Sequence, residues 1–210
     1  MSGTKIKICG LSRPEDMDYA NRTMPDYIGF VFWERSRRRV SREQAAELKR
    51  LLKPEIAAAG VFVDAPCENV ISLLEEGIID LAQLHGEESE EDIRYIQAAT
   101  GKPVLKAVKV RNRYDVEAWL DSGADYLLFD SGMGSGTAFD WGLLEDVGRD
   151  FFLAGGLNPG NLREALERIR PYGVDVSSGV ETEGVKDFEK MRSVVELVRS
   201  REIEKRGEEA

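Results

Sequence analysis

Two side chains that can exchange protons end short apolar runs in this sequence. Cys9 closes the segment Lys5–Cys9, and Asp130 follows the apolar residues 126–129. The thiolate form of a cysteine is a base and a nucleophile, and a neighbouring ammonium group favours that form. Lys7 lies two residues before Cys9, so in a strand both side chains point to the same face. We expect Lys7 to lower the pKa of the thiol; the alternative is a small buried hydrophobic side chain.

The carboxyl group of Asp130 is expected to be partly removed from water by the apolar run before it. Desolvation raises the pKa of a carboxyl group, and a raised pKa suits proton donation near neutral pH. The simpler use of Asp130 would be to cap a loop. Cys67 follows Asp64 and Pro66 without a comparable cationic partner, so we expect it to be inert.

Two glycine- and serine-containing segments have the composition of phosphate-binding loops. They are Gly155-Gly156-Leu157-Asn158 and Ser177-Ser178-Gly179-Val180. Small residues let backbone N–H groups approach an anion closely. Ordinary tight turns are the alternative. A third glycine-rich segment, residues 132–137, either closes over a ligand or is a passive connector.

Arginine is concentrated in one segment of an otherwise acidic chain. A guanidinium group can bind a carboxylate through two parallel hydrogen bonds. We expect one of these arginines to contact a ligand and the others to form an exposed charged face. The five are Arg35, Arg37, Arg38, Arg39 and Arg42. The single histidine, His85, is interpreted as a residue lining a site, although it could serve as an acid or a base.

Composition limits the class of protein. The chain has 210 residues, 42% of them hydrophobic and 32% charged, which suits one globular domain. A net charge of −10 argues against a nucleic-acid-binding surface, and no apolar run is long enough to cross a membrane. The N-terminal segment lacks a signal-peptide core, so we expect a cytoplasmic protein. Two distant cysteines and one histidine predict neither a disulfide framework nor a zinc site.

Strand-like runs alternate with helical patterns along the whole chain. The eight candidate strands cover residues 5–9, 27–32, 59–63, 80–85, 103–108, 125–130, 151–154 and 173–177. Eight parallel strands joined by helices can form a closed barrel, which leaves no exposed sheet edge. We therefore expect a single α/β domain with the (β/α)₈ or TIM-barrel fold. An open doubly wound sheet is the alternative, but Cys-Gly-Leu-Ser after the first strand is no dinucleotide fingerprint. We expect the barrel over residues 1–200 and a charged C-terminal tail over residues 201–210.

A barrel of this kind carries its site at the carboxyl ends of its strands. Residues at or just after the ends of the candidate strands are therefore expected to lie together. They are Cys9, Gln83, His85, Asp130, Gly156 and Ser177. The first and eighth strands are neighbours in a closed barrel. Lys7 and Asp175 have the same parity there, so we expect them to face each other and to tune Cys9.

Several segments together resemble one family, the phosphoribosylanthranilate isomerases of tryptophan biosynthesis. They are KIKICGL, IGFVF followed by SRRRVS, GVFV, AQLHGEE, FDSGMGSGTAFDW, LAGGLNPGN and VDVSSGVE, spread over nearly the whole chain. The sixth loop departs from many relatives at Met133 and Thr137, which bears on loop closure and not on the chemistry.

The resemblance implies a role for each matching residue. Cys9 is then the catalytic base, Asp130 the catalytic acid, and Arg38 the group that binds the anthranilate carboxylate. Residues implied at the phosphate or along the pocket are Gln83, His85, Gly134, Gly136, Gly156, Ser177, Ser178 and Gly179. No metal and no organic cofactor is implied.

The implied reaction is an Amadori rearrangement of a ribosylamine to an aminoketose, on a small phosphorylated substrate. The isomerase of histidine biosynthesis performs the same rearrangement but uses aspartate at the position of Cys9. A non-catalytic barrel that binds a sugar phosphate or a partner protein would have no use for both Cys9 and Asp130. Monomer and homodimer remain open from the sequence.

Overall fold

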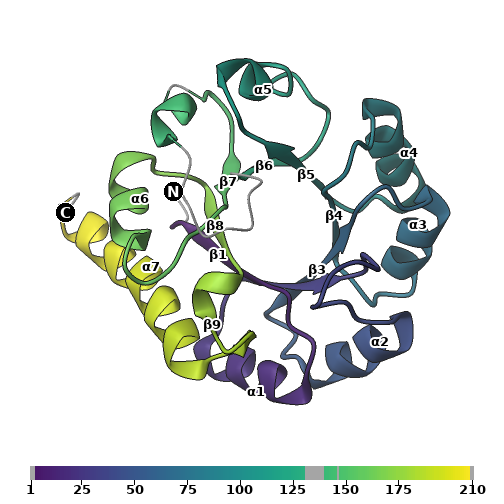
Figure 1. Cartoon of the computed structure of the whole chain (residues 1–210), viewed down its shortest axis with the longest axis horizontal. Coiled ribbons are helices and arrows are strands. Elements are labelled where there is room, and N and C mark those ends of the chain that lie inside the picture. Colours follow the sequence, from purple (N-terminus) through teal and green to yellow (C-terminus); the bar gives the residue numbers. More distant parts are fainter. Residues whose placement is uncertain (1–2, 131–139, 146, 209–210) are drawn as a thin grey trace.

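The computed structural model describes residues 3–130, 140–145 and 147–208, the last eight by their backbone alone. Eight parallel strands form a closed barrel in the order β1 to β8, and β8 pairs back onto β1 (Figure 1). The strands are β1 (Lys5–Cys9), β2 (Tyr27–Val31), β3 (Ala57–Phe62), β4 (Leu81–Leu84), β5 (Val104–Lys109), β6 (Tyr126–Asp130), β7 (Phe151–Leu153) and β8 (Gly173–Val176). The predicted (β/α)₈ barrel is confirmed.

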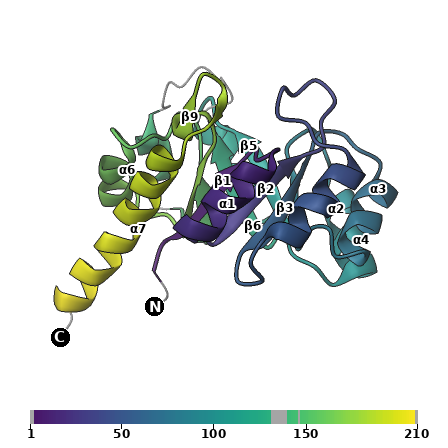
Figure 2. The same ribbon diagram turned by 90° about the horizontal axis from the view of Figure 1, so that it is seen from below.

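Helices surround the barrel on its outside, and the last of them runs beside the first (Figures 1 and 2). They are α1 (Pro14–Thr23), α2 (Arg42–Leu51), α3 (Cys67–Glu75), α4 (Glu90–Thr100), α5 (Arg113–Glu117), α6 (Leu162–Arg168) and α7 (Phe188–Glu208). Because α7 continues to Glu208, residues 201–208 extend the last helix. The division of the chain at residue 200 stays a prediction.

Two local features differ from the predicted strand-then-helix repeat. Among the described residues between β6 and β7, the helical segment is the short 3₁₀ helix η1 (Trp141–Leu144), where glycines at 142 and 148 disfavour a longer helix. After β8 and a second 3₁₀ turn, η2 (Ser178–Val180), the chain forms a hairpin of β9 (Glu181–Thr182) and β10 (Val185–Lys186). Its turn places Glu183 and Gly184 at positive φ, as tight hairpins require.

Alternation along the strands separates the barrel interior from the layer under the helices. Ile6, Ile8 and Phe30 point outward and belong to the main core, whereas Leu105 and Leu128 belong to a cluster inside the barrel. An aromatic group of Tyr27, Tyr126, Phe152 and Tyr172 fills the interior at the amino ends of the strands. That end is therefore closed by side chains, and the polar residues gather at the other end.

Asp26 ties the start of β2 to two other elements. Its carboxylate accepts hydrogen bonds from the side chain of Lys5 at 3.0 Å, the backbone N–H of Ile6 at 2.9 Å and Arg199 of α7 at 2.8 Å. Burial raises the pKa of Asp26, but these donors outweigh burial and hold the pKa below its usual value. The ionised carboxylate thus joins β1, β2 and α7.

Replacing this carboxylate by an amide should destabilise the fold in a pH-dependent way. A depressed folded-state pKa contributes stability above the unfolded-state pKa, near 3.9, and that contribution is lost as the pH falls through the folded-state value. We expect Asp26→Asn to lower the free energy of unfolding by about 1–3 kcal/mol at pH 7. Urea denaturation measured from pH 7 downward should show the difference shrinking in acid. A difference that stays constant with pH would contradict this role.

Candidate active site

A cavity of about 620 Å³ opens at the carboxyl ends of the strands. It brings together the predicted site residues Cys9, Arg38, Gln83, His85, Asp130, Gly156, Ser177 and Ser178. Gly179 does not line it and supports the loop behind. The predicted Gly134 and Gly136 lie outside the described residues. The cavity therefore joins residues from β1, β4, β6 and the loops after β2, β7 and β8.

Cys9 ends β1 as a buried side chain, 8% exposed, with its thiol on the cavity. Room for it comes from Gly29 on β2, where an added Cβ would lie 2.7 Å from Sγ. Beneath it, Nζ of Lys7 donates to Oδ1 of Asp175 at 2.9 Å, and both side chains are buried. The predicted contact between Lys7 and Asp175 is confirmed.

Lys7 lowers the pKa of the Cys9 thiol as expected, but the net shift of that pKa is upward, contrary to the expectation. Burial raises the pKa of the thiol, and the charge of Asp175 raises it further, while Lys7 and Lys186 lower it. The sum lies above the ordinary value. Sequence parity identified both Lys7 and Asp175, but it did not indicate the burial of the thiol, which outweighs the ammonium group. In this pocket the thiolate is a strong base that neighbouring cations stabilise only in part.

Asp130 ends β6 with a partly buried side chain, next to His85. Oδ2 of Asp130 lies 3.4 Å from Nε2 of His85, and Nδ1 of His85 lies 3.1 Å from Nε2 of Gln83. The two nitrogens of the imidazole thus face different partners, Nδ1 the amide of Gln83 and Nε2 the carboxyl group of Asp130. The sequence interpretation of His85 as a lining residue missed this contact, although Gln83 on β4 and His85 just after it share one parity.

The two predicted phosphate loops pack against each other. Gly155 and Gly156 both have positive φ after β7. An added Cβ on Gly179 would lie 1.9 Å from the carbonyl oxygen of Leu157, so the loop after β8 can approach the loop after β7 only with glycine there. The hydroxyl of Ser177 donates to the carbonyl of Cys9 at 3.1 Å, which fixes this loop to the end of β1.

Arg38 is the arginine of the basic segment that lines the cavity. Its Nε and Nη2 donate to the carboxylate of Glu181 at 2.6 and 2.9 Å. Arg37 binds the same carboxylate from an exposed position, and Arg42 contacts Glu76 on the outer surface. The segment therefore divides as expected, into one arginine at the cavity and others outside it. Glu181 and its third partner, Lys186, were missed because the two-residue strands of the hairpin carry no periodicity in the sequence.

Within the described ranges, no group of three or more His, Cys, Asp and Glu side chains could hold a metal ion. The expectation that the chemistry needs no metal and no cofactor stays a prediction. Of the helices in the described part of the chain, none is long and apolar enough to cross a membrane.

The fold and the position of the cavity place this chain among the (β/α)₈-barrel enzymes. The family model for N-(5'-phosphoribosyl)anthranilate isomerase matches residues 6–197. The chain belongs to that family.

Individual relatives resemble the chain over nearly its whole length. The N-(5'-phosphoribosyl)anthranilate isomerase of Endomicrobium trichonymphae is 45% identical over 201 residues, which cover 93% of this chain and 98% of the relative. The phosphoribosyl anthranilate isomerase of Thermus thermophilus is 39% identical with a TM-score of 0.84, covering 94% and 99% of the two chains. An isomerase in complex with reduced 1-(o-carboxyphenylamino)-1-deoxyribulose 5-phosphate is 35% identical with the same TM-score and coverage.

The influence of Lys7 on Cys9 can be measured by alkylation. Lys7→Met removes the ammonium group that lowers the thiol pKa and leaves Asp175, which raises it. Iodoacetamide labelling of Cys9 can be followed by mass spectrometry as a function of pH. We expect the labelling rate of Cys9 to rise at a higher pH in this variant than in the wild type. Adding Asp175→Asn should reverse part of the shift.

Cys67 provides the control within the same molecules. Burial and Asp92 raise its pKa to about 11, and neither Lys7 nor Asp175 contributes to that shift. Its labelling profile should be the same in all variants. An unchanged profile for Cys9 would mean that the ion pair does not tune the thiol.

Proposed function

We propose that this chain catalyses the Amadori rearrangement of N-(5'-phosphoribosyl)anthranilate to 1-(o-carboxyphenylamino)-1-deoxyribulose 5-phosphate, a step of tryptophan biosynthesis. The observation that carries the proposal is the meeting of the Cys9 thiol and the Asp130 carboxyl group in one cavity beside paired phosphate loops. Family membership over residues 6–197 supports the choice of substrate.

Ring opening is the step that needs an acid. Asp130 donates a proton to the ring oxygen of the ribose, the bond between C1 and that oxygen breaks, and the lone pair of the nitrogen forms a C1=N iminium. His85, whose Nε2 lies 3.4 Å from Oδ2 of Asp130, stabilises the carboxylate that Asp130 leaves behind by donating a hydrogen bond from Nε2. The iminium then serves as the electron sink, so the reaction requires neither a metal nor an organic cofactor.

Proton removal from C2 is the step that needs a base. The Cys9 thiolate takes this proton, and the electron pair of the C–H bond forms a C1=C2 double bond while the iminium becomes a neutral amine. The resulting enolamine gains a proton at C1 and loses the hydroxyl proton at C2, which gives the ketone. A thiol with a raised pKa is the stronger base once ionised.

Remote contacts hold the reacting carbons in place. Backbone N–H groups around Gly156 and at Ser177 and Ser178 bind the substrate phosphate, and Gly179 supports them from behind. Arg38 binds the carboxylate of the substrate, and Gln83 lines the pocket with His85. We assign Gly134 and Gly136 to the same ligand by the family pattern alone.

We propose that this enzyme acts on a small phosphorylated molecule in the cytoplasm and that it binds neither a nucleic acid nor a membrane. The isomerase of Thermotoga maritima, 36% identical, is described as dimeric. We propose a monomer or a homodimer for this chain.

Turnover of freshly prepared phosphoribosylanthranilate, followed by loss of its fluorescence, tests the function. We expect rapid decay with the wild type, and a fall in kcat of about 10²–10⁴-fold in both Cys9→Ser and Asp130→Asn with little change in KM. Cys67→Ser is the matched control and should retain full activity. Absence of wild-type decay would leave a barrel that binds a sugar phosphate, and full activity of Cys9→Ser would remove the thiol from the mechanism.

The phosphate loops can be tested with a pair of glycine variants. An added methyl group at Gly179 would force the loops after β7 and β8 apart, whereas Gly148 has open space where its Cβ would be. We expect Gly179→Ala to raise KM about tenfold or more, which corresponds to about 1.4 kcal/mol of binding, and Gly148→Ala to leave it unchanged. Equal KM values for the two variants would show that loop contact does not shape the phosphate site.

A further inference from the structure

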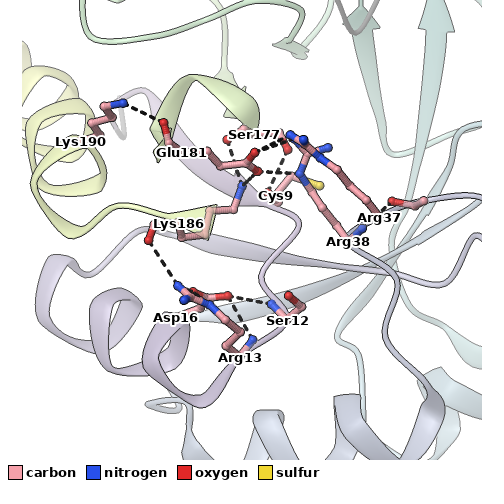
Figure 3. Close-up of polar contacts among 11 residues, drawn as sticks. Cys9, Ser12, Arg13, Asp16, Arg37, Arg38, Ser177, Glu181, Lys186 and Lys190 are labelled. Carbon is pink, nitrogen blue, oxygen red and sulfur yellow. Dashed lines mark hydrogen bonds and ion pairs between the residues drawn. The ribbon is translucent and has the colours of Figure 1, made fainter. Parts of the chain in front are cut away.

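The β9–β10 hairpin presents a buried carboxylate, that of Glu181, to the guanidinium group at the cavity. Figure 3 shows this carboxylate between Arg38 and Arg37 on one side and Lys186 on the other. The side chain of Glu181 is 5% exposed. Burial raises the pKa of Glu181, but hydrogen bonds from Arg38 and Lys186 outweigh it and keep the pKa below its usual value. The group is therefore ionised, and its charge is taken up by cations of the protein.

Arg38 has its orientation fixed on two sides. One edge of its guanidinium group, Nε and Nη2, binds both oxygens of Glu181. Its aliphatic part lies over Gly10, where an added Cβ would come within 2.3 Å of Cδ. Among the described residues, Nη1 of Arg38 has no hydrogen-bond partner. The N–H groups of Arg38 that Glu181 does not bind are therefore available, and Arg38 lines the cavity.

Lys186 connects the same carboxylate to the rest of the site. Its buried Nζ donates to Oε1 of Glu181 at 2.8 Å and to the carbonyl of Ser177 at 2.9 Å. The loop after β1 also reaches the hairpin, because Arg13 donates to the carbonyl of Lys186 at 3.3 Å (Figure 3). The hairpin is thus fixed to the phosphate loop and to the segment that follows Cys9.

The charges of this cluster suit an anionic ligand. Arg38 and Lys186 share one carboxylate, and exposed Arg37 adds a third positive charge. A negative group that enters the cavity next to Arg38 would meet an excess of positive charge. Glu181 itself has both oxygens occupied by cations, so its role is exerted through Arg38.

We propose that Glu181 is a positioning residue that determines specificity: by holding the Nε–Nη2 edge of Arg38, it directs the remaining donors toward the carboxylate of the ligand. The proposal rests on the proposed function, in which Arg38 binds that carboxylate. Without Glu181, the guanidinium group would sample other rotamers and lose its preference for a carboxylate-bearing ligand. Contacts with the rest of the ligand would persist.

Two stable ligands separate this role from a general structural one. The first is the reduced product analogue that carries the o-carboxyphenylamino group, and the second is its phenylamino counterpart without the carboxylate. Calorimetric titration of the wild type should show tighter binding of the first ligand. We expect Glu181→Gln to weaken the first ligand about tenfold, as for loss of a well-oriented charge-assisted hydrogen bond, and to change the second less than about twofold.

Arg37→Gln is the matched control, because Arg37 binds the same carboxylate but lies outside the cavity. It should leave both affinities within about twofold of the wild type. Glu181→Asp keeps the charge and draws Arg38 back by one methylene group, so it should show the same selective loss even if Glu181→Gln folds poorly. Equal loss for both ligands, or no loss for either, would overturn the proposal.

Measurement of kcat and KM distinguishes a failure of this inference from a failure of the proposed function. Glu181→Gln should raise KM for phosphoribosylanthranilate more than it changes kcat, because Glu181 contacts neither proton-transfer group directly. A wild type without turnover would contradict the proposed function. A variant of an active enzyme that loses kcat at constant KM would contradict the role of Glu181 alone.

Discussion

A lysine and an aspartate form an ion pair inside the barrel, at the seam where β8 closes onto β1. Lys7 and Asp175 are register partners on the two strands and lie in a layer with little access to water. Removing either partner would leave an uncompensated buried charge, which is costly, so the pair specifies how the seam closes. The same pair lies directly beneath Cys9 and acts on it with opposite signs. Closure of the fold and basicity of the thiol are thus coupled.

The interior changes character from one end of the barrel to the other. Aromatic rings fill the amino end, a layer of aliphatic side chains follows, and the ion pair and Cys9 come next. The apolar layers hold the polar layer at fixed positions, because close-packed interiors have low compressibility. The loops after β7 and β8 and the hairpin then complete the cavity. Each contributes a contact that depends on the strands beneath it.

Much of this arrangement could be predicted from the periodicity of apolar residues in the sequence and from the alternation of side chains along each strand. Two-residue alternation places Lys7, Cys9 and Asp175 on the inner face, and that prediction is confirmed by the pair at 2.9 Å. The hairpin could not be predicted, since strands of two residues carry no periodicity and the turn signal is only Glu183 and Gly184. The lowering effect of Lys7 on the Cys9 pKa follows from this alternation, but the net rise of that pKa does not, because burial is a tertiary property. The contact of His85 with Asp130 joins the ends of β4 and β6, which are separated by β5, so strand pairing did not predict it.

A crystal structure of the wild type with bound reduced 1-(o-carboxyphenylamino)-1-deoxyribulose 5-phosphate would test the arrangement of acid and base most directly. We predict Sγ of Cys9 at about 3–4 Å from C2 of the sugar chain, as a near-attack geometry requires. The carboxyl group of Asp130 should lie on the other side of the ligand, within hydrogen-bond distance of the oxygen that belonged to the ribose ring. A ligand whose C2 faces away from Cys9, with Asp130 out of reach of that oxygen, would contradict the assignment of both groups.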